Sequence, residues 1–292
     1  MMSSSVKSHG RCNLMNTSKL LIFLFLMNIA IILLGDLIAG AIGIYAALLL
    51  LAFTDVMTIF NADKIMLYQF QAKPMDGHAL DAVKPLVQSL ADKAKVSMPT
   101  LYLINEQTPN LFVVQSIAKR GSIAVTSGLL NALNREELMS VLAYCVGHLY
   151  DRDAFIATAT AVIAGGISGL AIVDYAALFL SDNDDPPKSC NKTIMAIFGP
   201  VASWIVKGLS SFATTFRADH KAVQLCDHVT GFISALGKLE AAKQRNGVIL
   251  NAEIRPSSAH IFFISPLQDP KLSAMFSVLP STVDRIAHLQ RA

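Results

Sequence analysis

The sequence predicts a mostly helical α+β membrane protein, with about four transmembrane helices in two hairpins and one soluble domain. Of its 292 residues, 53% are hydrophobic and only 15% are charged, whereas a soluble domain carries about 25% charged residues. Four apolar stretches account for this excess. The polar segments that adjoin them contain helical apolar stripes and short β-branched runs, which favours the α+β class.

The first membrane hairpin is predicted over residues 20–60. Residues 20–34 are apolar with one exception, and after Gly35-Asp36 a second apolar stretch covers residues 37–60. A membrane helix needs about 20 apolar residues, so the second stretch is long enough, whereas the first needs flanking residues or a thin bilayer. A cleaved signal peptide is the alternative, because Ala39-Gly40-Ala41 has the form of a cleavage site. Cleavage would still leave an apolar stretch, so we favour the hairpin.

The second hairpin is predicted over residues 154–212. Its apolar stretches cover residues 154–180 and about 193–212, and a polar turn with three aspartates, residues 181–188, separates them. A buried helical pair in a soluble domain is the alternative. The third stretch is longer and less charged than such a helix requires, whereas the fourth contains Pro200 and Lys207 and is a weaker prediction.

The distribution of basic residues predicts the orientation. The tail, residues 1–19, carries basic residues and no acidic ones, while both hairpin turns are acidic. Basic flanks stay on the cytoplasmic side, so the tail and both long polar segments, residues 61–153 and 213–292, are expected in the cytoplasm. These segments would form one domain of a multi-pass protein of the inner (plasma) membrane.

Composition excludes two other classes. A net charge of +3 without aromatic residues among basic runs gives no reason to expect a nucleic-acid partner. Cys12, Cys145, Cys190 and Cys226 are scattered, with neither a CxxC pair nor a framework spacing, so we expect no disulfides.

Helices and strands of the soluble domain follow from local patterns. Residues 79–95 carry a helical apolar stripe, and residues 101–104 and 123–126 are short candidate strands. Asn134 followed by Glu137 forms a capping box, which predicts a helix over residues 134–153.

The helix over residues 134–153 carries the candidate site. Tyr144 and His148, four residues apart, flank the apolar stripe and would present their side chains side by side. The stripe itself consists of Leu138, Val141, Leu142, Cys145 and Leu149. Taken alone, His148 fits a polar flank better than a metal ligand, because it has no ligand partner four residues earlier.

Short blocks occur along the chain in a characteristic order. They are Asp63-Lys64-Ile65, residues 99–103, Thr108-Pro109-Asn110, residues 123–130, residues 133–138, residues 216–219, Ala259-His260 with Pro266-Leu267, and residues 285–289. In order and spacing these blocks resemble the HtpX family of membrane-integrated zinc metalloproteases, from about Leu20 onward. The resemblance implies a zincin-like domain built from the two polar segments.

The resemblance also implies positions for a zinc site. In that family the active helix carries H-E-x-x-H, whose histidines bind zinc and whose glutamate is the general base. Here Tyr144 and His148 stand at the histidine positions and Cys145 at the base position. Thr215 stands at the third ligand, and Leu279 replaces a further histidine near the C-terminus.

One ligand of three therefore remains. A catalytic zinc needs three protein ligands and one open position, so we expect no cofactor, although the resembling family uses zinc. Asp153 and Asp219 are retained but are neither ligand nor base in that family, so we predict that they support the packing around the site.

Two other kinds of catalytic site remain as alternatives. A rearranged metal site could use Cys145, His148, Asp219, His220 and Cys226. A cysteine protease could use Cys145 as nucleophile and His148 as base, but a reactive thiolate needs an exposed, electropositive setting. Asp153 and Asp219 could also be considered as an acid–base pair.

The favoured function is a non-catalytic HtpX-like homologue, a pseudoprotease that binds or regulates in membrane protein quality control. The alternative is an active membrane metalloendopeptidase that degrades misfolded membrane proteins with non-standard ligands. Expected partners are the lipid bilayer, membrane proteins or unfolded peptides, and an active homologue in an oligomer. A sheet edge at Asn110, Ala124 and Val125 would bind an extended peptide, unless a loop of the chain caps it.

Overall fold

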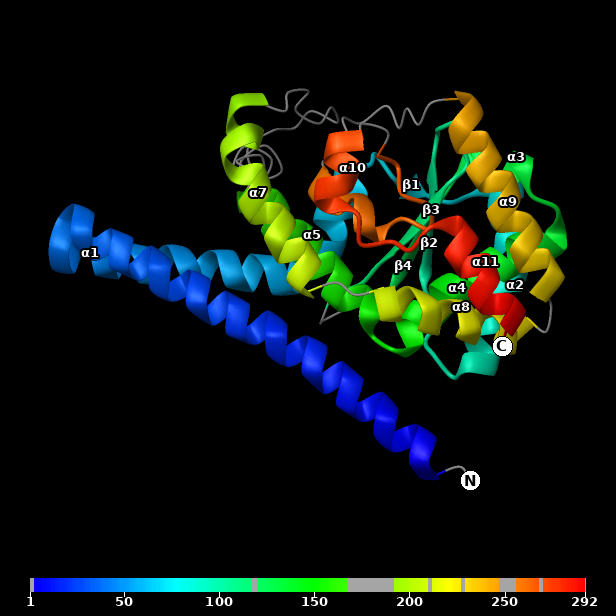
Figure 1. Ribbon diagram of the computed structural model, residues 1–292, viewed down its shortest axis with the longest axis horizontal. Helices are drawn as coiled ribbons and strands as arrows, with labels where there is room; N and C mark the ends of the chain where they lie inside the picture. The colour runs from blue at the N-terminus through cyan, green and yellow to red at the C-terminus, as the bar shows by residue number, and fades with distance from the viewer. Residues whose placement is uncertain are drawn as a thin grey trace.

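A four-stranded sheet forms the centre of the fold, and a long helical hairpin projects from it (Figure 1). The structure, a computed structural model, describes residues 3–116, 120–167, 192–209, 212–226, 229–246, 256–267 and 270–291. The strands are β1 (Lys73–Pro74), β2 (Thr100–Ile104), β3 (Leu111–Val114) and β4 (Ser122–Thr126), in the order β1-β2-β4-β3. β2 and β4 are parallel, and the other two pairs are antiparallel.

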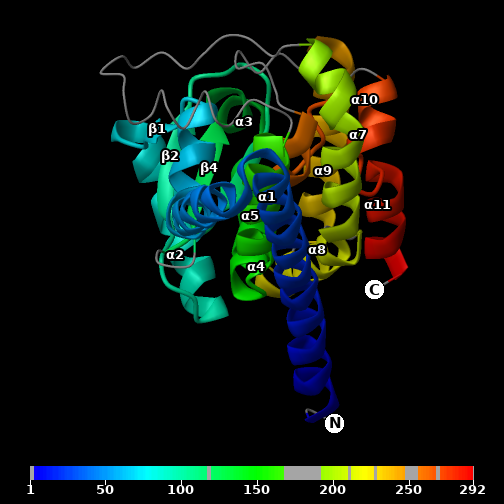
Figure 2. The same cartoon turned by 90° about the vertical axis from the view of Figure 1, so that its left-hand side faces the viewer.

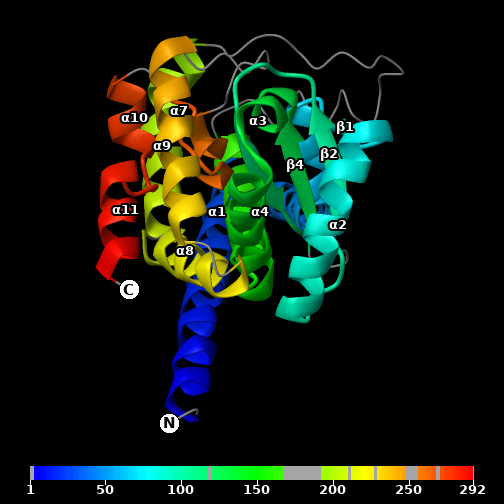
Figure 3. The same ribbon diagram turned by 90° about the vertical axis from the view of Figure 1, so that its right-hand side faces the viewer.

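Helices make up most of the described chain, which confirms the mostly helical α+β class. Their bounds are α1 (Ser3–Gln69), α2 (Gly77–Ala94), α3 (Ser127–Ala132), α4 (Arg135–Tyr150), α5 (Asp153–Ile167), α7 (Lys192–Leu209), α8 (Phe212–Cys226), α9 (Val229–Asn246), the 3-10 helix η1 (Pro256–Ile261), α10 (Pro270–Phe276) and α11 (Thr282–Arg291). Figures 2 and 3 show α4 between the sheet and the layer of α8, α9 and α11.

Both faces of the sheet are buried at β3 and β4, which explains why β3 and the middle of β4 are apolar without interruption. Ile123 and Val125 of β4 point into the cluster that contains α2 and α4. Ala124, between them, packs with Phe112 and with the end of α1 on the other face. Alternation along β2, β3 and β4 thus divides the core around the sheet into two clusters.

The helix-forming signals that the sequence carries are confirmed. The predicted helix at 79–95 is α2, and the strands at 101–104 and 123–126 are β2 and β4. The capping box at Asn134 and Glu137 opens α4, which ends at Tyr150 rather than at the predicted 153. Arg152 adopts a positive φ of 56°, and this turn separates α4 from α5.

The turn of the first hairpin lies at Ala39–Gly40, so its predicted position at Gly35-Asp36 is wrong. Gly40 has a φ of 55°, which interrupts α1 and reverses the chain. Gly35 instead packs inside the hairpin, where a Cβ atom on it would lie 2.5 Å from the carbonyl oxygen of Gly43. Close packing, rather than chain reversal, therefore explains Gly35.

The corrected turn gives two arms of similar length. Residues 20–38 and 41–60 each measure about 30 Å at 1.5 Å per residue, which removes the shortage in the first stretch. One stretch of the described residues, Ile31–Leu51, is long and apolar enough to cross a membrane, with a mean hydropathy of 2.2. It contains the Gly40 bend, and its side chains are mostly exposed.

The second predicted hairpin is described only in part. α5 begins at Asp153 and packs against α1, α7 and η1, and α7 covers most of the predicted fourth stretch. Residues 168–191, which include the polar turn and Cys190, lie outside the described residues. The number of membrane spans in the chain stays a prediction.

Candidate functional site

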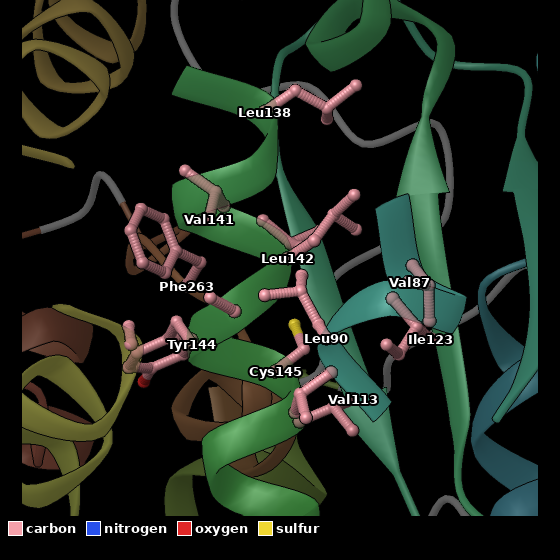
Figure 4. Packing of buried hydrophobic residues seen from close by; sticks show 14 of the residues in the cluster. Val87, Leu90, Val113, Ile123, Leu138, Val141, Leu142, Tyr144, Cys145 and Phe263 are labelled. Carbon is pink, nitrogen blue, oxygen red and sulfur yellow. The ribbon is translucent and has the colours of Figure 1, made fainter. Parts of the chain in front are cut away.

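α4 positions the candidate site because other elements pack against it on several faces and fix it in place. It packs against α2, α8 and α9, and its side chains from Leu138 to Leu149 are buried, apart from half-buried Met139 and His148. Figure 4 shows Cys145 pointing toward Leu90 and Val113, with Tyr144 on the opposite side of the helix. Burial raises the pKa of the Cys145 thiol. Cys145 therefore behaves as a core residue and does not reach the site.

The other substituted positions meet at one cavity. Tyr144, His148, Thr215 and Leu279, which lie far apart in the sequence, line a cavity of about 40 Å³, which has room for a few water molecules. Asp153 lines it as well. The structure thus brings together four of the five positions that the resemblance assigned to the site, and Cys145 is the exception.

Tyr144 and His148 contact each other as their spacing predicts. Their ring centroids are 4.6 Å apart in an edge-to-face arrangement, and Tyr144 shares a side-chain hydrogen bond with Thr215. Burial, followed by the nearby Arg285 and Arg217 guanidinium groups, lowers the pKa of His148 to about 3. His148 is therefore neutral at physiological pH and faces two positive charges.

Arg285, which sequence reasoning did not place in the site, supplies the strongest of these charges. Its Nε and Nη2 atoms donate to the two carboxylate oxygens of Asp219 at 2.9 and 2.6 Å, and Nη1 donates to the Phe263 carbonyl oxygen at 2.8 Å. The guanidinium carbon lies 5.0 Å from the centre of the Tyr144 ring. The sequence signal that could have indicated its burial is its spacing: Arg285 lies four residues before Leu289, on the same face of α11, and both side chains are buried.

The two retained aspartates each bind an arginine. Asp219 is fully buried against Arg285, and Arg217 Nη2 donates to Asp153 Oδ2 at 2.8 Å. Each carboxylate therefore bonds to a guanidinium, and the role of the two aspartates in supporting the packing around the site stays a prediction. As an acid–base pair they would have to leave these ion pairs.

Ala124 and Val125 do not form a sheet edge, so that part of the peptide-binding prediction is wrong. β4 is an inner strand, paired with both β2 and β3. The edge strand beside β4 is β3, and the chain itself covers part of it. The Phe263 N–H donates to the Leu111 carbonyl oxygen at 3.0 Å. Asn110 Nδ2 donates to the Ile264 carbonyl oxygen at 2.8 Å, so its side chain is occupied as well.

The donor set does not fit zinc. Of the family's three ligand positions only His148 carries a metal-binding side chain, and the Arg285 and Arg217 guanidinium groups oppose a further cation. Within the described part of the chain, no group of three or more His, Cys, Asp or Glu residues could hold a metal ion. The rearranged set does not converge, because Cys145 faces the sheet, Asp219 binds Arg285 and exposed His220 contacts Gln224.

Comparison with known proteins agrees with this architecture. An α+β domain with two site positions four residues apart on one helix and a third on a neighbouring helix is typical of metallopeptidases. Residues 80–292 match Peptidase family M48, and the chain belongs to this family.

The relatives extend the match to nearly the whole chain and confirm the HtpX-like resemblance. Protease HtpX of Legionella pneumophila (strain Lens) is 34% identical over 280 residues, which cover 95% of this chain and 99% of that protein. A Protease HtpX homolog of Desulfatibacillum aliphaticivorans is 34% identical over 283 residues, 95% of this chain and 90% of its own. The solved structure of S. mikatae Ste24p aligns with a TM-score of 0.48 at 14% identity, over 97% of this chain and 66% of its own.

Proposed function

We propose that this chain is an integral membrane, HtpX-like protein without zinc-protease activity, and that it binds or regulates partners in membrane protein quality control. The observation that carries the proposal is the composition of the cavity. By the family resemblance, Tyr144 and Thr215 replace two metal ligands and Leu279 replaces a further histidine, and all three line the cavity with His148. Arg285 lies next to Tyr144. Water bound there would have neither a metal ion nor a free carboxylate to activate it.

Burial accounts for the loss of the other reactive groups. A phenol binds metal only after losing its proton, and burial raises the pKa of Tyr144 far above the physiological range. The Cys145 thiol is buried on the sheet side of α4, so a nucleophile–base pair with His148 has no geometric support. These observations favour a binding role over both other kinds of catalytic site.

The proposed setting is a multi-pass protein of the plasma membrane whose soluble domain lies in the cytoplasm. Its support is the exposed apolar hairpin of α1 and the basic N-terminal tail. Membrane proteins, their unfolded segments or an active homologue are the partners that such a location makes available.

Zinc content and proteolysis test the proposal together. We expect the full-length protein, purified in detergent, to hold well under one zinc per chain and to leave an unfolded test protein uncleaved, with or without a chelator. Stoichiometric zinc that is lost in His148→Ala but kept in His220→Ala, accompanied by chelator-sensitive cleavage, would establish the active metalloendopeptidase instead.

Restoration of the ligands is the complementary experiment. Tyr144→His, Cys145→Glu and Thr215→Glu, with Leu279→His added in a second variant, are expected to raise zinc content, because the scaffold already brings positions 144, 148, 215 and 279 to one cavity. A matched variant with Gln at positions 145 and 215 controls for changes in folding.

A further inference from the structure

We infer that Trp204, on α7, lies in the headgroup region of the bilayer on the side of the soluble domain, given the membrane integration proposed above. The partner of this surface is the lipid bilayer itself. α7 would then meet the membrane at its surface at this residue, whereas a span over residues 193–212 would place Trp204 near the bilayer centre.

The exposure of Trp204 is the first observation. It is 70% exposed, while its neighbours Ala202, Ile205 and Val206 are buried at 1% or less. α7 is therefore anchored to the protein on one face and presents its single indole ring on the other. The ring belongs to the one tryptophan of the whole sequence.

Packing between three helices places Trp204 level with the point where α1 leaves the domain. Ala62 of α1 belongs to the same buried cluster as Ala161 and Val162 of α5. The next residue of α5, Ile163, packs in a second cluster with Ala202 and Val206 of α7. Trp204 lies between Ala202 and Val206 in the sequence of α7. Phe60, which is 48% exposed, lies two residues before Ala62 on α1.

The side of Trp204 on which the membrane lies follows from the residues on each side of it. Toward the domain, Lys207 is exposed and its Nζ donates to the Ala274 carbonyl oxygen at 2.9 Å, and Leu209 lines the candidate cavity with His148. On the other side the α1 arm runs about 30 Å from residue 60 to the turn, the thickness of the hydrocarbon core.

Aromatic side chains mark both ends of this arm. Tyr45, 68% exposed, lies near the turn, and Phe60 and Trp204 lie at the domain end. Tryptophan and tyrosine concentrate where apolar rings meet headgroups, and a lysine one turn farther out can keep its ammonium group in water. The arrangement of Tyr45, Trp204 and Lys207 matches a bilayer that ends at the level of Trp204.

Fluorescence of the single tryptophan tests this depth directly. The full-length protein is reconstituted into phosphatidylcholine vesicles that contain lipids brominated either near the headgroup or near the chain ends, and iodide is added as an aqueous quencher. We expect shallow bromines to quench Trp204 at least about twofold more than deep ones. Stronger quenching by deep bromines, or by iodide alone, would overturn the inference.

Matched variants identify which proposal fails if one does. Trp204→Phe supplies the blank; adding Tyr45→Trp to it reports on the hairpin, and adding Val283→Trp reports on a site 75% exposed on α11. Lipid quenching of the Tyr45→Trp reporter without quenching of Trp204 would reject only the interfacial position. Absence of lipid quenching from both would reject membrane integration itself.

Discussion

Arg285 determines the electrostatics of the candidate site more than any residue that the ligand pattern points to. Burial opposes its charge, but the Asp219 carboxylate outweighs this effect and raises the pKa of Arg285 above its usual value. The guanidinium also lies against the Tyr144 and Phe263 rings. A fixed, fully buried cation thus occupies the region around the substituted ligands.

Removing one partner of this ion pair should destabilise the protein strongly. Arg285→Met leaves Asp219 buried without its counter-charge, which costs about 3–5 kcal/mol, whereas Asp219→Asn combined with Arg285→Met should recover a large part of the loss. Thermal unfolding in detergent measures the cycle. Arg217→Met breaks the pair with Asp153, in which the arginine is partly exposed, and should cost less, about 1–3 kcal/mol. Equal losses from both arginines would contradict this account.

His260, the other histidine that lines the cavity beside His148, should make the free energy of unfolding fall in mild acid. Burial lowers its pKa from 6.5 to about 4, although hydrogen bonds to the backbone of Ala157 and Ser257 act in the opposite direction. Between these pH values the unfolded chain binds a proton that the folded chain does not, so stability is full above pH 6.5 and is lost as the pH falls toward 4.

The effect amounts to about 2 kcal/mol at pH 5. His260→Gln, which cannot take up this proton, should lose correspondingly less stability between pH 7.5 and pH 5 in thermal unfolding. His78→Gln, at an exposed position on α2, should behave like the wild type. Identical acid sensitivity in all three proteins would show that His260 is not buried in its neutral form.

At the scale of elements, the start of α4 can be predicted from the hydrogen bonds that neighbouring residues form with each other. The Asn134 side chain accepts from the Glu137 N–H, and the Glu137 carboxylate accepts from the Asn134 N–H. The structure adds Ser234 and Lys238 of α9, both of which donate to the Glu137 carboxylate. The sequence marks the start of the helix, but the partner helix becomes visible only after folding.

The α1 hairpin illustrates the opposite case and gives an element-scale prediction. Gly43→Ala would place a Cβ atom 1.9 Å from the Gly35 carbonyl oxygen of the facing arm, so the arms must separate, at a cost of about 1–3 kcal/mol. Gly208→Ala, on α7, meets open space and should be neutral or stabilising by about 0.5–1 kcal/mol. Melting temperatures in detergent compare the two; an unchanged Gly43→Ala protein would rule out close packing of the arms.

At the scale of the whole molecule, the helices that precede residue 153 pack against the helices from residue 212 onward. Tyr144 and His148 come from the first of these parts of the chain, while Thr215, Leu279 and Arg285 come from the second. α4 packs against both α8 and α9, so the site exists only when the two parts are joined. Substitutions where α4 contacts α8 and α9 should therefore affect both the cavity and the stability of the fold.

The sequence by itself determined the mostly helical α+β class of the chain and the helix that carries the candidate site, whereas the substitutions at metal positions are what the family resemblance implies. Those properties depend on composition, on short-range spacing and on blocks whose order can be compared with a family. The sequence could not determine that β4 is an inner strand, because strand order depends on contacts between distant segments.

Only the tertiary structure decided the position of the hairpin turn, the occupied edge of β3 and the place of Arg285. Gly35 and Gly40 are the same residue type, but Gly40 has a positive φ and reverses the chain, whereas Gly35 packs against Gly43. Arg285 looks like an ordinary charge on an amphipathic helix until folding buries it on Asp219. Burial and long-range pairing give identical side chains different roles, and local patterns do not contain that information.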